Sequence, residues 1–253
     1  MTAPVMPGAE PMFVAGSEHP DDGVLVVHGF TGNPQSMRPV AQAFAAAGYT
    51  VSMPLLPGHG TAIEDMVPTG WADWSAAAEA AYQELAGRCR RVVVVGLSMG
   101  GALTCWLATR HPEIVGIVCV NPVIEPAADS FLDVLRGSLD QGIEVIPGIG
   151  SDIAKPGSVE NAYKGTPVGP LLSLLEAVAE LAPRLGEIRC PVLLFTSVQD
   201  HVVPPSGSDL LASSVSGPVE RVVLERSYHV ATLDWDAEEI QSRSVDFAEK
   251  LFA

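Results

Sequence analysis

Short runs of consecutive apolar residues alternate along this chain with longer segments in which apolar residues recur every three or four positions. The short runs are rich in valine, leucine and isoleucine, which is typical of strands that are buried on both faces of a sheet. The longer segments have the spacing of amphipathic helices. The repeated order of strand, helix and strand predicts a mostly parallel sheet with helices on both faces.

This alternation is most regular in the first half of the chain. Strands are expected at residues 12–15, 23–28, 49–53, 91–95 and 115–120, and helices at residues 36–47, 71–86 and 99–110. Gly48 follows the first of these helices, where glycine commonly ends a helix. The pattern returns near the end of the chain, with strands expected at 192–196 and 221–224 and helices at 208–214 and 237–251.

The alternation is interrupted between residues 121 and 188, where glycine and proline are frequent. One helix is expected there, from about Pro170 to Leu181, because its apolar residues have helical spacing. We therefore expect residues 1–122 and 188–253 to form an α/β core, and residues 123–187 to form a small inserted cap. The apolar stripe of the cap helix can pack against the core, line an acyl-chain pocket, or do both.

Composition is consistent with one globular domain and excludes some partners. The 253 residues are 47% hydrophobic and 17% charged, a balance that favours a filled interior over disorder. The formal net charge of −16 repels nucleic-acid phosphates and anionic lipid headgroups. We therefore expect a small neutral or weakly polar substrate, no nucleic-acid partner, and at most transient contact with lipid surfaces.

The cysteines and the apolar segments give further expectations. Cys89, Cys105, Cys119 and Cys190 lie singly beside apolar segments and lack the paired spacing of a zinc site, so we expect reduced core residues. The first residues lack a positive region followed by an apolar core, and no segment is apolar for long enough to span a bilayer. These features favour a cytoplasmic location.

The sequence Gly96-Leu97-Ser98-Met99-Gly100 joins a predicted buried strand directly to a predicted helix. A serine at such a sharp turn adopts a strained backbone, and side chains two residues away on either side would collide. Glycine at positions 96 and 100 leaves the necessary space. The motif alone is weak, but its place between strand and helix predicts that Ser98 is a nucleophile.

Two backbone amides are expected to stabilise an oxyanion beside Ser98. The helix that follows Ser98 directs its N-terminal amides and positive dipole end toward the serine, which makes the Met99 amide one donor. The segment His28-Gly29-Phe30-Thr31-Gly32 follows an earlier strand, and there the Phe30 amide can point into the same pocket.

A serine nucleophile needs a base, and the base in turn needs a carboxylate that orients it. His229 follows the last predicted strand, and Asp200 follows the strand at 192–196, in the chain order serine, acid, histidine. His201 is the serious rival for the base. Asp129 and Asp234 are weaker candidates for the acid.

Four segments together resemble a known family. They are His28-Gly29-Phe30, Gly96-Leu97-Ser98-Met99-Gly100, Asp200-His201-Val202-Val203-Pro204-Pro205 and Ser227-Tyr228-His229-Val230-Ala231-Thr232-Leu233-Asp234. Over nearly the whole chain, the sequence resembles compact bacterial monoacylglycerol lipases and their carboxylesterase relatives. The resemblance implies the α/β-hydrolase fold, the nucleophile Ser98, the acid Asp200, the base His229, and the oxyanion amides of Phe30 and Met99.

Glu160 has two interpretations. From the residues alone it is either a solvated surface acid or a carboxylate at the mouth of an apolar pocket, where it would accept hydrogen bonds from an alcohol. The segment at 148–153 and the segment Glu160-Asn161-Ala162-Tyr163 also resemble the cap of that lipase group, which implies that Glu160 recognises glycerol.

The sequence thus predicts a serine hydrolase of carboxylic esters that acts through an acyl-enzyme, with monoacylglycerols as the preferred substrates and no metal or organic cofactor. Cleavage of general short- to medium-chain carboxylesters is the alternative enzyme class. A non-catalytic ligand-binding protein of the same fold, a peptidase and a thioesterase stay open on these residues. A haloalkane dehalogenase is disfavoured, because it would need aspartate in place of Ser98.

Overall fold

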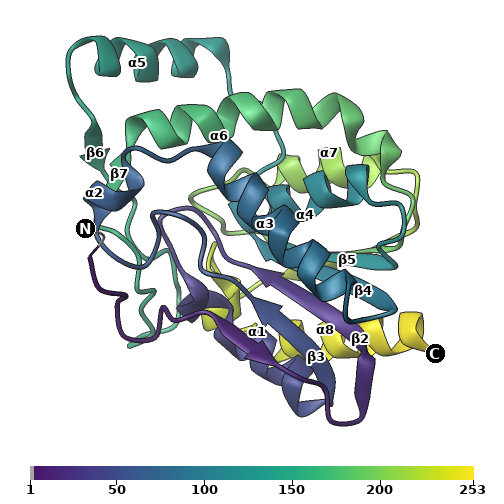
Figure 1. The fold of residues 1–253 in the computed structure, drawn as a ribbon. Coiled ribbons are helices and arrows are strands. Elements are labelled where there is room, and N and C mark those ends of the chain that lie inside the picture. Colours follow the sequence, from purple (N-terminus) through teal and green to yellow (C-terminus); the bar gives the residue numbers. More distant parts are fainter. Residues whose placement is uncertain (1–2) are drawn as a thin grey trace.

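A central, mostly parallel sheet positions the predicted site. The computed structural model describes residues 3–253, and within this range the sheet has seven strands in the order β1-β3-β2-β4-β5-β8-β9 (Figure 1). The strands are β1 (Met12–Val14), β2 (His19–Val27), β3 (Tyr49–Met53), β4 (Arg91–Leu97), β5 (Gly116–Val120), β8 (Val192–Ser197) and β9 (Val219–Leu224). Only the edge pair, β1 with β3, is antiparallel within the described sheet.

Helices cover the sheet on two faces. They are α1 (Pro34–Ala46), α2 (Ile63–Met66), α3 (Trp71–Ala86), α4 (Met99–Arg110), α5 (Asp129–Asp140), α6 (Val168–Leu181), α7 (Ser206–Ser214) and α8 (Ala237–Phe252). One core cluster joins the sheet to α3, α4 and α6, and the other joins the opposite face to α1 and α8. The predicted architecture, a mostly parallel sheet flanked by helices, is therefore confirmed.

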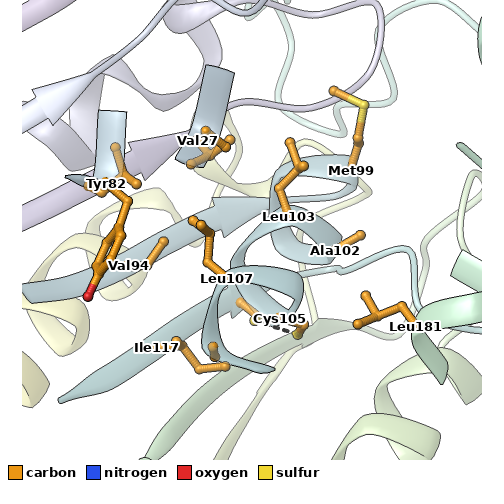
Figure 2. Packing of buried hydrophobic residues seen from close by; sticks show 14 of the residues in the cluster. Val27, Tyr82, Val94, Met99, Ala102, Leu103, Cys105, Leu107, Ile117 and Leu181 are labelled. Carbon is orange, nitrogen blue, oxygen red and sulfur yellow. Dashed lines mark hydrogen bonds between the residues drawn. The ribbon is translucent and has the colours of Figure 1, made fainter. Parts of the chain in front are cut away.

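Strand β4 shows why the apolar runs are continuous. Val92 and Val94 point into the cluster with α4, whereas Val93 and Val95 point into the cluster with α1. Successive side chains of a strand lie on opposite faces, so a strand covered on both faces needs apolar residues at every position. Figure 2 shows Leu103 and Leu107 of α4 packed near Val27, Val94 and Ile117 of the sheet.

Most of the predicted elements occur within one to four residues of their expected bounds. The bounds of β3, α3 and α4 are as predicted. Strand β2 begins four residues earlier than predicted, at His19, because exposed polar residues extend the buried strand. The cysteines are free thiols, as predicted, with Cys89, Cys105 and Cys119 buried and Cys190 partly exposed.

The prediction of a single helix between residues 121 and 188 was wrong. The structure contains α5 in addition to α6, and also a small hairpin of β6 (Val145–Pro147) and β7 (Gly165–Pro167). In α5 only Leu132 and Leu135 are buried, and Gly137 lowers helix propensity by about 1 kcal/mol relative to alanine. The helix therefore depends on packing against α6, which the local sequence pattern does not reveal.

The elements between β5 and β8 lie over one edge of the sheet. Helix α6 contributes Leu174, Val178 and Leu181 to the core cluster shared with α3 and α4. On its other side, Val168 and Leu175 pack against α5, which lies outside α6 and away from the sheet (Figure 1). Among residues 3–253, no helix combines the length and apolarity that crossing a bilayer would require.

The packing around α4 generates a stability prediction. Leu107 is fully buried between α4 and the sheet, so Leu107→Ala is expected to lower the free energy of unfolding by about 2–5 kcal/mol. Val134→Ala is the control, because Val134 on α5 is 62% exposed and its truncation is expected to change that free energy by less than about 0.5 kcal/mol. Urea unfolding curves measure the free energy of unfolding of each variant. Equal losses in the two variants would contradict the burial of Leu107 between α4 and the sheet.

Candidate active site

Ser98 occupies the turn between β4 and α4 in a strained backbone conformation, with φ 57° and ψ −117°. Its amide donates to the carbonyl of Val120, and its carbonyl accepts from the amides of Ala102 and Val123. These bonds hold the turn from β5, from α4 and from the segment after β5. A non-glycine residue at positive φ persists only where the surroundings enforce it.

Glycines on either side make this turn possible. A Cβ atom on Gly96 would overlap the carbonyl of Gly100, and a Cβ atom on Gly100 would overlap the carbonyl of Val27. Both obstacles are backbone atoms, which cannot rotate away as a flexible side chain can. The structure therefore supplies the steric reason for the Gly-x-Ser-x-Gly spacing.

The segment after β2 approaches Ser98 closely. A Cβ atom on Gly29 would lie 3.3 Å from the Cβ atom of Ser98. Phe30 is the next residue, and it lines the same cavity as Ser98. Met99 is the first residue of α4, so its amide has no helical carbonyl to bind and is available to a ligand. The predicted oxyanion donors thus lie on the two segments that meet at Ser98.

His229 and Asp200 lie in contact on adjacent loops after β9 and β8. Nδ1 of His229 is 2.7 Å from Oδ2 of Asp200, and the side chains are 7% and 2% exposed. A carboxylate only accepts hydrogen bonds, so the neutral ring donates from Nδ1 and leaves Nε2 to accept a proton. Oδ1 of Asp200 accepts the amides of Val202 and Val203, each at 2.8 Å, which fixes the carboxylate.

The rival residues have other environments. Nδ1 of His201 lies 2.8 Å from Oδ1 of Asp152, and the His201 side chain is 58% exposed. Asp129 begins α5 and is exposed. Asp234 is buried, and its carboxylate accepts the backbone amides of Ala154, Lys155, Tyr228 and Trp235. Of the two candidate bases, His229 lines the cavity that contains Ser98 and His201 does not, and the carboxylate that contacts the His229 ring is Asp200.

Asn121 and Asp152 belong to the site but were not predicted from the sequence. Nδ2 of Asn121 donates to the His229 carbonyl at 2.8 Å, and its Oδ1 accepts the amide of Ser197. Asp152 accepts the amide of His229 from the opposite side at 3.0 Å. In the sequence, the one feature that could have marked Asn121 as a site residue is its place directly after a buried strand. No local pattern marks Asp152 as a site residue.

Backbone strain is concentrated at this edge of the sheet. Among residues 3–253, the non-glycine residues with positive φ are Thr31, Ser98 and Asn121, and they follow β2, β4 and β5. These strands are neighbours in the sheet. Such strain costs on the order of 1–3 kcal/mol per residue and is typical of functional sites, where it holds reactive groups in place.

Two buried histidines support the Phe30 segment. His28 donates from Nδ1 to the Gly29 carbonyl, and its Nε2 accepts the amide of Leu56 at 3.1 Å. Burial lowers the pKa of His28 to about 4 and the pKa of His59 to about 3. Both rings are therefore neutral at physiological pH, and His28 keeps the acceptor that its bond to Leu56 requires.

A cavity of about 700 Å³ opens beside Ser98. Near Ser98 and His229 it is lined by polar groups of Thr31, Asp152 and Glu160. Its remaining wall is apolar and is formed mostly by residues between β5 and β8, including Val123, Ile124, Phe131, Ile146, Leu171, Leu174 and Leu175. The cavity thus offers a polar end at the nucleophile and an apolar end that suits a hydrocarbon chain.

Glu160 lies at the polar end of the cavity, against Gly32. A Cβ atom on Gly32 would lie 2.5 Å from Oε1 of Glu160, so the glycine leaves room for the carboxyl. Burial raises the pKa of Glu160 to about 7, while the charge of His229 and a hydrogen bond with Ser36 oppose the rise. Glu160 is thus partly buried, and it is one of the residues that line the cavity.

Known proteins share this sequence and fold. Residues 24–240 match the sequence profile of the alpha/beta hydrolase family. The chain is 46% identical over 248 residues to a thermostable monoacylglycerol lipase of Bacillus sp. (strain H-257), covering 98% of this chain and 97% of that protein. It is 27% identical to a carboxylesterase of Bacillus subtilis (strain 168), covering 91% of this chain and 94% of that protein.

A solved structure is similar over the whole chain. The structure of a metagenome-derived lipolytic enzyme superposes with a TM-score of 0.92 and 44% sequence identity. The match covers 98% of this chain and 100% of that chain, so the segment between β5 and β8 is included. The sheet, its helices and the segment between β5 and β8 are therefore shared with that enzyme.

The raised pKa of Glu160 predicts a pH-dependent effect on stability. The folded protein binds this proton more tightly than the unfolded chain, so the carboxyl destabilises the fold progressively as the pH rises from about 4.5 to about 7. Glu160→Gln is expected to match the wild type below pH 4.5 and to be more stable above pH 7, by on the order of 3 kcal/mol, because a shift of one pKa unit corresponds to about 1.4 kcal/mol. Thermal unfolding at pH 4 and pH 8 measures the difference.

Glu180→Gln is the control, because Glu180 is exposed on α6 and lies outside the cavity. It is expected to unfold at the wild-type temperature at either pH. A Glu160→Gln protein whose stability relative to the wild type is the same at pH 4 and pH 8 would contradict the raised pKa.

Proposed function

The chain belongs to the alpha/beta hydrolase family and is a carboxylic ester hydrolase, and from this membership we propose that it hydrolyses monoacylglycerols through Ser98, His229 and Asp200. The observation that carries the proposal is Ser98 at a strained strand-to-helix turn, in the same cavity as His229, whose Nδ1 contacts Asp200. The similarity to a monoacylglycerol lipase supports the substrate class.

In the proposed acylation step, Oγ of Ser98 attacks the ester carbonyl carbon while Nε2 of His229 takes the hydroxyl proton. The electron pair of the carbonyl bond moves to its oxygen, and the amides of Phe30 and Met99 donate to that oxyanion. Collapse of the tetrahedral intermediate breaks the bond to the alcohol oxygen. His229 then gives its proton to this oxygen, and glycerol leaves.

Deacylation follows the same path with water in place of the serine. His229 takes a proton from the water as its oxygen attacks the acyl carbon, and the same amides stabilise the second oxyanion. The bond to Oγ of Ser98 breaks, Oγ recovers its proton from His229, and the fatty acid leaves. Asp200 stays ionised throughout and stabilises the imidazolium that forms in each step.

We further propose that residues 123–187 act as a cap that forms the substrate cavity. Phe131, Ile146 and Leu171 of this segment line the apolar end. The segment is also tied to the core near the site: Tyr163 donates its amide to the carbonyl of the strained residue Thr31 at 3.1 Å, and its hydroxyl donates to the carbonyl of Gly58. An acyl chain along the apolar wall would place its ester carbonyl at Ser98.

Glu160 is the proposed glycerol-recognition residue. Its carboxyl lies at the polar end of the cavity, where glycerol would lie when the acyl chain occupies the apolar end. Hydroxyl groups of glycerol can donate to a carboxylate, and such charge-assisted bonds are stronger than neutral ones. An alcohol without spare hydroxyl groups, such as methanol, offers no partner to this group.

The role of Ser98 gives the first functional prediction. Ser98→Ala removes the attacking oxygen, so turnover of a 1-monoacylglycerol is expected to fall by at least about 10⁴-fold. Fatty-acid release by the purified protein measures the loss, and circular dichroism verifies the fold. Ser242→Ala, an exposed serine on α8, is the matched control with full activity. Retained turnover in a folded Ser98→Ala protein would refute the nucleophile.

Substrate preference gives the second prediction. Wild-type protein is expected to release fatty acid from a 1-monoacylglycerol with at least tenfold higher kcat/KM than from the methyl ester of the same acid. Glu160→Ala is expected to remove most of this preference by slowing the glycerol ester alone, because only that substrate donates to Glu160. Equal cleavage of the two esters by the wild type would instead identify a general carboxylesterase, the class named for the Bacillus subtilis relative.

A further inference from the structure

We propose that Asp152 is a positioning residue that fixes the backbone of His229 and joins the loops of the catalytic base and acid. The proposal rests on the proposed function of Ser98, His229 and Asp200. Asp152 lies between β6 and β7 in the sequence, within the proposed cap, but its carboxylate contacts loops of the core. The side chain is 10% exposed and lines the substrate cavity.

The carboxylate of Asp152 makes hydrogen bonds to both loops. Its Oδ2 accepts the amide of His229 at 3.0 Å and the amide of His201 at 3.2 Å. Its Oδ1 lies 2.8 Å from Nδ1 of His201. The backbone carbonyl of Asp152 also accepts the amide of Val230 at 3.1 Å. One residue thus contacts two successive amides of the His229 loop and the residue that follows Asp200.

Together with Asn121, Asp152 holds the backbone of His229 at both its amide and its carbonyl. From the core side, Asn121 donates to the His229 carbonyl at 2.8 Å. The amide and the carbonyl of the same residue are therefore bonded to side chains from two different segments. The imidazole has one further bond, between its Nδ1 and Asp200. Without Asp152, the backbone of His229 would be held from the core side alone.

The position of His229 matters because proton transfer is sensitive to distance. A base must lie within hydrogen-bond reach of the proton that it takes, and a displacement of about 1 Å costs about 100-fold in rate. The loops of Asp200 and His229 follow parallel neighbouring strands and make no backbone hydrogen bond to each other beyond the pair at Val198 and Leu224. Asp152 bridges these loops where their catalytic residues lie.

Asp152 is not a second orienting acid. It contacts His229 through the backbone amide, whereas the imidazole bonds to Asp200. What the backbone amides require is an acceptor oxygen at the position of Oδ2, and asparagine can provide one. The amide nitrogen of asparagine would then face Nδ1 of His201, which accepts in one neutral tautomer. Alanine provides no acceptor for either amide.

The test compares Asp152→Ala with Asp152→Asn in the full chain. Hydrolysis of p-nitrophenyl acetate is measured because this small ester needs neither the acyl wall nor glycerol recognition. Rates are expressed per active site titrated with a fluorophosphonate, so unfolded protein does not count. Asp152→Ala is expected to lower kcat by about 10- to 100-fold with KM within about twofold of the wild type, and Asp152→Asn to stay within about threefold in kcat.

Ser158→Ala is the matched control. Ser158 also ties the proposed cap to the core, by donating from Oγ to the carbonyl of Leu233 at 2.7 Å, but it contacts neither His229 nor Asp200. Its kcat is expected to equal that of the wild type. If Asp152→Ala yields no titratable active sites, Asp152→Ser is compared with Asp152→Asn instead. The serine side chain is shorter than that of aspartate and cannot reach the amide of His229 or of His201.

Three outcomes would overturn the proposal: an unchanged kcat in Asp152→Ala, an equal loss in Asp152→Asn, or a rise in KM for the monoacylglycerol with no change for p-nitrophenyl acetate. The last outcome would assign Asp152 to alcohol binding instead. Ser98→Ala is measured in parallel, with its rate expressed per mole of folded protein because it lacks the serine that the fluorophosphonate labels. Full activity in that variant would refute the proposed function, whereas an inactive Ser98→Ala with a normal Asp152→Ala would refute only the role of Asp152.

Discussion

The close approach of three backbone segments at the ends of β2, β4 and β5 is the constraint on which the site depends. Ser98 reaches its position only because Gly96, Gly100 and Gly29 have no Cβ atoms to collide with neighbouring backbone or with the serine itself. Thr31 and Asn121 accept positive φ angles on either side of it. The strain is distributed over the three strands and is balanced by the large apolar clusters on the two faces of the sheet.

Charge around the nucleophile is controlled by burial and by hydrogen bonds. The neutral ring of His28 supports the segment of Phe30, because burial keeps its pKa near 4. The carboxyl group of Asp200 is bonded to two backbone amides and to the imidazole of His229. Glu160, which has fewer partners, has its pKa raised to about 7 by the same burial. The carboxyl groups of Asp200 and Glu160 thus have different hydrogen-bond partners, and burial raises the pKa of the Glu160 carboxyl because few polar groups compensate for its loss of solvent.

The sequence predicted the parts of the molecule that depend on local patterns. Continuous valine runs such as that of β4 predict strands buried on both faces, and the order of Ser98, Asp200 and His229 follows from which strand each residue ends. Helix α5 was missed because its burial depends on α6. Asn121 and Asp152 were missed because these partners lie 76 and 77 positions away, at Ser197 and His229 respectively. Long-range polar contacts of this kind leave no periodic signal in the chain.

Helix α6 lies between the core of the protein and helix α5. One of its faces belongs to the core cluster, and the other holds α5, which has no place in the clusters that bind the sheet to its helices. Phe131 of α5 nevertheless lines the cavity. Changes in α5 can therefore reshape the wall of the cavity at Phe131 while the sheet and the strained serine turn stay intact. In evolutionary terms, α5 is therefore a place where the wall of the cavity can diverge among related enzymes while the residues that hold the sheet to its helices are conserved.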